Sequence, residues 1–314
     1  MDSLLVALNV VFPLIVLIAV GYAAGALRWI SHEAFSQLNS LVFNVLLPCV
    51  LFENVYSASL SEIFNVKQIL FGVGAVIIIF TCGVPLSSRL TRDPAKRGVA
   101  LQSLFRSNFV LYGLPIVQSI YPKDRLGPTT LMIAVIVPVF NVLAVIALEM
   151  FRGGDVNALK IALNIIKNPL IIGTALGLVF SATGVRLPQA ARNSLSSLTN
   201  AATPVALIIL GGTFRRQSLG ENKTLLTALT FLRLLAVPAI FVCAAIPLGF
   251  RDVELLTFVA LFGSPVAVSS FSMAKQMGAD SELAGQTLLF TTVFSILTIF
   301  MWVSVLNHFA LIVS

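Results

Sequence analysis

The sequence predicts an all-α membrane protein with ten transmembrane helices. Of its 314 residues, 58% are hydrophobic and only 11% are charged, and the mean hydropathy is +0.98. That composition is far too apolar for a soluble globular domain. The apolar residues form ten runs of bilayer length, and the longest loops between them hold only about a dozen residues. These loops leave no room for a separate soluble module.

Loops that carry charges or turn residues separate the first five runs. The N-terminal run lacks the basic segment of a signal peptide and is long enough to cross a bilayer, so we expect it to be the first span. The basic loop "RLTRDPAKR" divides the third run from the fourth. The five spans lie at about residues 4–25, 38–56, 68–88, 97–120 and 128–150.

Five more runs complete the chain, at about residues 158–182, 188–213, 223–249, 254–276 and 283–312. Backbone polar groups in lipid must be hydrogen-bonded within the segment or within a closed barrel. The runs are too long and too evenly apolar for barrel strands, so we expect helices throughout.

Loop charges predict the orientation of the chain. The loops after the odd-numbered spans hold 11 basic residues, whereas the alternate loops hold 6. The first set is Arg28, Arg89, Arg92, Lys96, Arg97, Arg152, Lys160, Arg215, Arg216, Lys223 and Lys275, and the second is Lys67, Lys123, Arg125, Arg186, Arg192 and Arg251. The positive-inside rule assigns the richer set to the cytoplasm, so both termini are expected outside.

An internal repeat divides the chain into residues 1–152 and 153–314. Pro13 and Gly21 recur as Pro169 and Gly177, 156 positions later, and "NVLLP" at 44–48 recurs as "NAATP" at 200–204 at the same displacement. Each half holds five spans, and an odd number forces the halves into opposite orientations, as in many secondary transporters. Chance alignment among 14 prolines is the alternative.

Polar residues interrupt the fourth span, and a proline interrupts the ninth. Ser107 and Asn108 lie about ten residues into the fourth span, or roughly 15 Å, which is mid-bilayer. Pro265 lies at a similar depth from the other side, 158 positions after Ser107. Interrupted helices of this kind surround the binding site in inverted-repeat transporters.

Five segments together resemble the auxin efflux carrier family. They are "FPLIVLIAVGYAAG", "LNSLVFNVLLPCVLFENV", "SNFVLYGLP", "KNPLIIG" and "SPVAVSSFSMAK". The family includes the plant PIN-type auxin carriers and bacterial transporters of small organic anions, and the similarity covers nearly the whole chain. The plant members carry a proline just before the asparagine of the fourth helix, where this chain has Ser107. The proline of the ninth helix is present as Pro265.

The resemblance implies a panel domain (about 1–56 and 158–213) and a core domain (about 68–150 and 223–312). In that arrangement the broken fourth and ninth helices cross near the midplane of the membrane. It further implies a small anionic substrate, a carboxylate or an auxin-like indole acid, moved by alternating access. A bacterial plasma-membrane location and a homodimer through the panel helices are also implied.

Asn108 is the first candidate ligand, because a polar side chain at mid-bilayer depth must face protein or a water-filled cavity. An interhelical hydrogen bond is the alternative. The further candidates are Ser107, Ser264, Ser269, Asn44 and Asn141, although serines also bond to their own helix. Gly113, Pro115, Gly263 and Pro265 are expected to shape the breaks rather than touch the substrate.

Charge inside the spans favours an anionic substrate. Arg106, Lys167 and Arg233 lie within or near the membrane, and the positive ends of half-helices at a break add to the same potential. Arg106 is a candidate anion contact, with a salt bridge to Glu149 or snorkelling as the alternatives. Lys167 and Arg233 are expected to be interfacial anchors or structural pairs.

Other functional classes find little support in the sequence. The chain has no metal-ligand spacing and no phosphate-binding loop, His32 and His308 are isolated, and the three cysteines lie within apolar runs, so we expect neither an enzyme nor a cofactor or metal. Its basic residues form no stripe for nucleic acid. A channel, a membrane sensor and a relative of the bile-acid sodium symporters are the alternatives. Those symporters use an acidic residue near the ninth-helix break, which "LFGSPVAVSSFSMAKQM" lacks.

Overall fold

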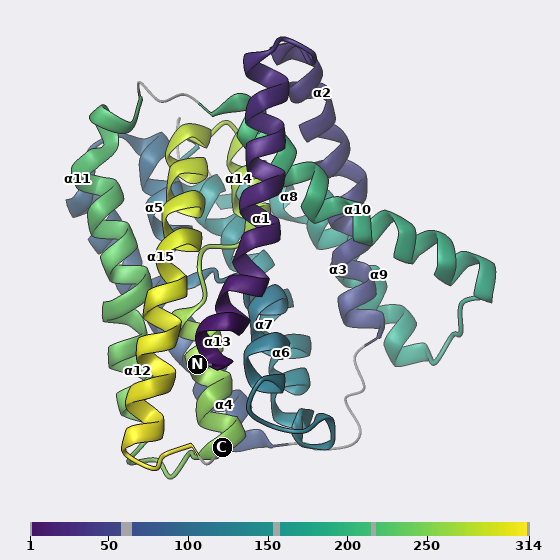
Figure 1. Ribbon diagram of the computed structural model, residues 1–314. Helices are drawn as coiled ribbons and strands as arrows, with labels where there is room; N and C mark the ends of the chain where they lie inside the picture. Colours follow the sequence, from purple (N-terminus) through teal and green to yellow (C-terminus); the bar gives the residue numbers. More distant parts are fainter. Residues whose placement is uncertain (1, 58–64, 153–157, 215–217, 313–314) are drawn as a thin grey trace.

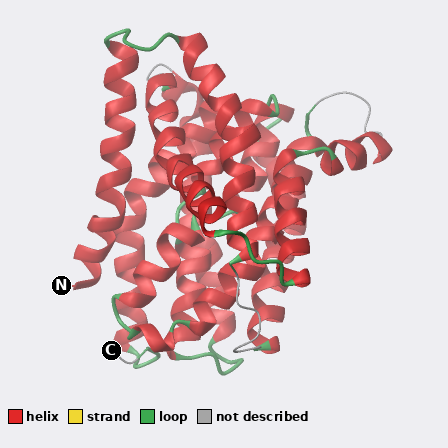
Figure 2. Cartoon of the chain, turned by 90° about the vertical axis from the view of Figure 1, so that its right-hand side faces the viewer, coloured by secondary structure: helices red, strands yellow, loops and turns green. Residues whose placement is uncertain are grey.

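The computed structural model describes residues 2–57, 65–152, 158–214 and 218–312, and this part of the chain is almost entirely helical (Figure 1). This part contains helices and loops and no strand (Figure 2). One isolated bridge pairs Ser107 with Val266. Six helical segments are each long and apolar enough to cross a membrane. They are His32–Tyr56, Val66–Leu90, Gly127–Met150, Gln189–Thr213, Gly220–Ala245 and Ser281–His308. The prediction of an all-helical membrane protein is therefore confirmed.

The helices of the first half begin and end close to the expected spans. Side-chain caps start several of them: the oxygens of Asn65 and Asp93 accept hydrogen bonds from the first turns of α4 and α5. The elements are α1 (Asp2–Ala26), α2 (His32–Leu41), the π-helix η1 (Val42–Leu46), α3 (Leu47–Tyr56), α4 (Val66–Leu90), α5 (Pro94–Phe105), α6 (Phe109–Gln118), the short η2 (Lys123–Arg125) and α7 (Gly127–Met150).

The second half follows the same order. Asn168 and Asp280 cap α9 and α15 through their side chains. The elements are α8 (Ala158–Ile166), α9 (Pro169–Thr183), α10 (Gln189–Thr213), α11 (Ser218–Phe231), the π-helix η3 (Leu232–Ala236), α12 (Val237–Ala245), α13 (Asp252–Gly263), α14 (Val268–Gln276) and α15 (Ser281–His308).

Small residues let two pairs of helices approach closely. A Cβ on Gly21 of α1 would lie within 2.0 Å of the backbone of Ile208 in α10, and one on Gly177 of α9 would lie within 2.8 Å of the backbone of Phe52 in α3. Gly177 follows Gly21 by 156 positions, and Ile208 follows Phe52 by the same number. The contact of α1 with α10 thus has a counterpart in the contact of α9 with α3, at the displacement found in the sequence. Small residues at such interfaces are typical of helix packing in membranes.

The bundle has two ends, the terminal end and the basic end. Both chain termini lie at one of them, the terminal end, where the amide of Asp252 donates to the carbonyl of Leu311 (Figure 1). The other is the basic end, where the α1–α2 and α4–α5 turns lie and where Lys96 forms a 4.0 Å ion pair with Asp280. The two interrupted pairs, α5–α6 and α13–α14, lie between these ends.

Candidate functional site

Two short non-helical segments meet inside the bundle. The first, residues 106–108, separates α5 from α6, and the second, residues 264–267, separates α13 from α14. The amide of Asn108 donates to the carbonyl of Pro265 at 2.8 Å, and the amide of Ala267 donates to the carbonyl of Arg106 at 3.4 Å. These two hydrogen bonds pair the segments in antiparallel orientation. Each break therefore provides hydrogen-bond partners for backbone groups of the other.

Local chemistry explains why the helices stop here. Pro265 has no N–H, so it cannot bond to the carbonyl of Leu261 four residues earlier. The backbone is extended on both sides of it: Ser264 before it has φ −68° and ψ 151°, and Ala267 after it has φ −66° and ψ 138°. The hydroxyl oxygen of Thr291 in α15 accepts a hydrogen bond from the amide of Val266 at 3.1 Å. In the first break Arg106 is extended, with φ −85° and ψ 104°, although no proline is present.

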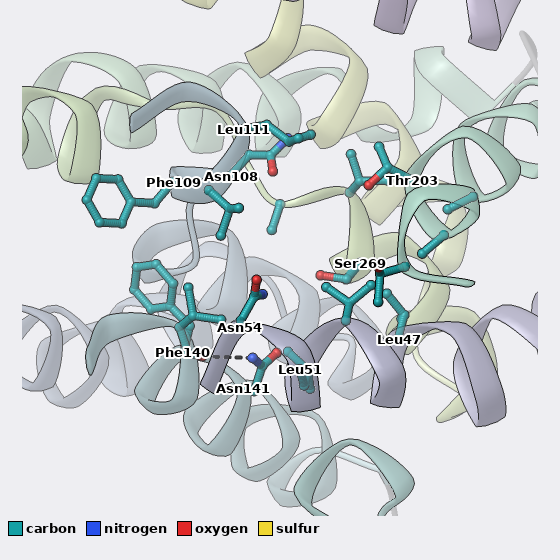
Figure 3. A pocket seen from close by; sticks show the side chains of 18 of the residues that line it. Leu47, Leu51, Asn54, Asn108, Phe109, Leu111, Phe140, Asn141, Thr203 and Ser269 are labelled. Atoms are coloured by element: carbon teal, nitrogen blue, oxygen red, sulfur yellow. Dashed lines mark hydrogen bonds between the residues drawn. The ribbon is translucent and has the colours of Figure 1, made fainter. Parts of the chain in front are cut away.

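A cavity of about 470 Å³ lies between the breaks and helices α1, α3, α7 and α10. That volume is within the usual range for small-molecule sites. Figure 3 shows the side chains of Asn54, Asn108 and Ser269 pointing towards the same open space. The polar and charged lining residues are Glu53, Asn54, Arg106, Ser107, Asn108, Asn141, Thr199, Asn200, Thr203 and Ser269.

Arg106 brings a buried positive charge to this cavity. Its side chain is 3% exposed and donates to Oδ1 of Asn141 and to the sulfur of Met273. Within the described part of the chain no carboxylate lies within 4.0 Å of it. Glu149, the partner considered from the sequence, bonds instead to Arg152 and Asn164, both at 2.9 Å. Arg106 therefore neither pairs with Glu149 nor snorkels to the surface.

The helix starts at the breaks add to the positive potential. Neither α6 nor α14 has a side-chain cap, and the first residues of both, Phe109 and Val268, line the cavity. Asn108 is 8% exposed, and its Nδ2 has no partner among the described residues, nor has the hydroxyl of Ser107. Free N–H groups at a helix N-terminus attract anions. The site thus joins two helix N-termini, an amide and a guanidinium.

Some residues expected at the site lie elsewhere. Asn44 is exposed and donates to the carbonyl of Ser40 in its own helix, and it does not line the cavity. Ser264 is fully buried at the second break, with its hydroxyl bonded to the carbonyl of Ala260. Arg106, Ser107, Asn108, Asn141 and Ser269 are brought together around the cavity.

The residues expected to shape the breaks lie beside the cavity rather than in it. Gly263 ends α13, and Pro265 lies within the break that follows. Gly113 and Pro115 are inside α6, where a Cβ on Gly113 would come within 2.8 Å of the ring of Phe109. None of the four lines the cavity.

Several lining residues were not selected from the sequence. Asn200 and Thr203 belong to "NAATP", the second copy of the sequence repeat, whereas Asn44 was selected from the first copy, "NVLLP". Glu53 and Asn54 line the cavity from α3. The polar pair "EN" in an apolar run was the available indication.

Arg233 is neither an interfacial anchor nor part of an ion pair in the described structure. It is fully buried, and its guanidinium donates to three backbone carbonyls, those of Leu104, Leu261 and Ser264. Lys167, by contrast, is exposed just before α9.

The cavity is closed towards the basic end. Nδ2 of Asn39 in α2 donates to the carbonyl of Ser272 in α14 at 3.3 Å, and the hydroxyl of Ser40 donates to Oε1 of Gln276 at 3.2 Å. In the helical segment His32–Tyr56, the lining residues all belong to α3, from Leu47 to Asn54, and none belongs to α2 at the basic end. The cavity therefore extends from the breaks towards the terminal end.

No group of three or more His, Cys, Asp or Glu side chains suited to a metal ion occurs in the described ranges. The polar lining of the cavity consists mainly of amides, hydroxyls and one guanidinium. Groups of these kinds are able to bind and orient a polar ligand, and those in the described lining include no nucleophile with an adjacent base.

Residues 6–303 match the family of membrane transport proteins, and the chain belongs to it; this is the family of the auxin efflux carriers. The protein is therefore a multi-pass membrane transporter and not an enzyme.

Relatives over almost the full length support this assignment. The chain is 26% identical to an uncharacterized transporter of Methanothermobacter thermautotrophicus, over 94% of this chain and 97% of the relative. It is 25% identical to a Rhizobium meliloti protein named "Putative malonate transporter", over 93% of both chains. An Escherichia coli K12 protein named uncharacterized transporter YfdV is 22% identical, over 93% of this chain and 95% of the relative.

Proposed function

We propose that this protein transports small organic anions, carboxylates or indole acids, through the cavity at the two breaks. The observation that carries the proposal is the convergence of two uncapped helix N-termini and the Arg106 guanidinium, which has no carboxylate partner in the described residues, on one cavity. A buried positive charge is costly unless an anion offsets it. A substrate carboxylate would supply that anion.

Alternating access is the mechanism that this arrangement favours. The ten spans form two inverted five-helix repeats, residues 1–152 and 153–314, in this proposal. The matched contacts of Gly21 with Ile208 and of Gly177 with Phe52 support it. The panel would comprise α1–α3 and α8–α10, and the core the remaining helices. The hydrogen bond between Asn39 and Ser272 closes the basic end, and the cavity extends towards the terminal end. In this proposal the structure corresponds to the access state that opens at the terminal end.

Orientation and location complete the proposal. The basic end would face the cytoplasm of a bacterial cell and both termini the outside. In a background without native cysteines, a cysteine at Lys123 should then react with an impermeant thiol reagent in intact cells, and one at Arg92 should not. The reverse pattern would overturn the orientation. A homodimer through the panel helices remains a proposal from the family resemblance.

A thermal-shift screen of the purified protein tests the substrate class. Malonate, acetate and indole-3-acetate are compared with their amides, because a ligand at 100 times its Kd stabilises the folded state by about 2.7 kcal/mol. We expect at least one acid, and none of the amides, to raise the melting temperature. Stabilisation by the amides alone would contradict anion recognition. Saturable uptake of the stabilising acid into proteoliposomes separates a carrier from a channel, and its dependence on sodium separates it from the sodium symporters.

A further inference from the structure

Arg233 lies where both interrupted helices end. Its Nε donates to the carbonyl of Ser264 at 2.9 Å, one terminal nitrogen donates to Leu104 at 2.9 Å, and the other donates to Leu261 at 3.1 Å. Leu104 belongs to the last turn of α5, and Leu261 to the last turn of α13. One side chain from η3 thus bonds to both helices that lead into the crossing.

The three carbonyls are among those that the breaks leave without their helical partners. In a continuous helix Leu104 would accept from Asn108, but that amide donates to Pro265. Leu261 would accept from residue 265, which is a proline and has no N–H. Ser264, the C-cap residue of α13, lies at the start of the second break. Carbonyls at a helix end need other donors when they are buried, and Arg233 supplies them.

The position of this charge also affects the potential in the cavity. At the crossing, the negative C-terminal ends of α5 and α13 lie close to the positive N-terminal ends of α6 and α14, and the two effects oppose each other. A cation bonded to the C-terminal ends offsets their negative potential. The potential from the N-terminal ends then dominates at the cavity, although Arg233 is not among its lining residues.

Resting on the proposed anion transport, we propose that Arg233 is a positioning residue of the site. It holds the two breaks in register through the carbonyls of Leu104, Leu261 and Ser264, and it keeps the cavity favourable to anions without touching the substrate. Trp302 stabilises the π-helical turn that carries Arg233. Its Nε1 donates a hydrogen bond to the carbonyl of Leu234 at 3.2 Å.

The first test is hydrogen exchange by mass spectrometry on Arg233→Gln, Arg233→Lys and Lys167→Gln, all in the full chain. Lys167→Gln is the matched control, because it removes one exposed cation. Arg233→Gln should accelerate exchange at residues 106–109 and 266–269 together, by about tenfold or more, because both breaks lose donors. Arg233→Lys should show the same pattern, since an ammonium lacks the planar fork. Acceleration at one break alone, or in the control as well, would overturn the positioning role.

The second test separates charge from packing by anion affinity. Malonate and its singly charged monoamide are titrated into the same variants. Arg233→Gln should weaken malonate binding by about 3- to 30-fold, and the monoamide by less, whereas Arg233→Lys should recover most of the malonate affinity. Equal losses for both probes in Arg233→Gln would overturn the electrostatic part of the proposal. Absence of binding in the unmodified protein, with the exchange pattern as expected, would contradict the proposed transport of these anions and leave the positioning role supported.

Discussion

The two breaks have the same backbone arrangement, but they present different kinds of side chain to the cavity. Each separates two half-helices, and each donates one backbone amide to the other. The first presents Arg106, Ser107 and Asn108 to the cavity. The second consists of Ser264, Pro265, Val266 and Ala267, of which Ala267 alone lines the cavity. The two breaks therefore share a backbone arrangement, while the first alone presents polar side chains to the cavity.

The difference has a physical origin in how each break is made. Pro265 interrupts its helix by removing a donor, so the second break needs no polar side chain. The first break has no proline, and its extended residue Arg106 is held by the bonds of its side chain to Asn141 and Met273. Arg106 therefore both stabilises the first break through these bonds and brings its charge to the cavity.

The largest expected effect follows from removing the charge of the first break. Arg106→Gln should weaken malonate binding by about 30-fold or more, because a buried charge interaction is lost. Titration calorimetry measures the change. Arg152→Gln, which removes an exposed cation bonded to Glu149, is the matched control and should bind as the unmodified protein does. Similar malonate affinities for the two variants would mean that the charge of Arg106 does not contribute to anion binding.

A smaller effect is expected from making the second break more regular. Pro265→Ala restores an N–H that can donate to the carbonyl of Leu261. The equilibrium between the continuous and the broken helix should shift towards the continuous one by about 3- to 10-fold. Turnover in proteoliposomes should fall by a similar factor, since no substrate-contacting group is removed. Pro115→Ala, inside α6 and away from the breaks, is the control. Equal turnover in both variants would show that the proline does not determine the break.

The half-helix after the second break also closes the basic end, and the half-helix after the first does not. Asn39→Ala removes the bond to Ser272 and should shift the population towards opening at the basic end by about 2- to 10-fold. The alkylation rate of a cysteine at position 269, measured with a thiol reagent supplied from each side in turn, reports this shift. Ser194→Ala, an exposed position on α10 whose hydroxyl bonds to its own helix, is the control. An unchanged ratio of the two rates would contradict the assignment of this closure.

The smallest effect is expected from making the two breaks alike. Ser107→Pro should fold and bind malonate within about threefold of the unmodified protein, because the preceding residue is already extended, as a proline requires. The bonds of the bridge use the amides of Asn108 and Ala267, not that of Ser107. Melting temperature and affinity check this expectation, and loss of folding would show that the first break tolerates no proline.

The sequence predicted the helical class and the residues at which two helices stop, because hydropathy and proline chemistry act locally. It also predicted the displacement of 156 residues that relates Gly21 to Gly177. It could not decide which copy of a repeated asparagine faces the cavity, since that depends on the rotation of α2 and η1 against the core: Asn44 turned out exposed, and Asn200 lines the cavity. The carbonyl partners of Arg233 depend on three helices at once, and no local pattern contains them.

Comparison of two asparagines tests the central claim, that the first break binds the anion. Asn108 lines the cavity with an unpartnered amide nitrogen, whereas Asn44 is exposed and bonded to its own helix. Both are replaced by alanine, and malonate affinity and melting temperature are measured for each. Asn108→Ala should remain folded and monodisperse and bind about 5- to 150-fold more weakly, the loss of one contact of about 1–3 kcal/mol, while Asn44→Ala binds normally. Unchanged affinity in a well-folded Asn108→Ala protein would contradict the account.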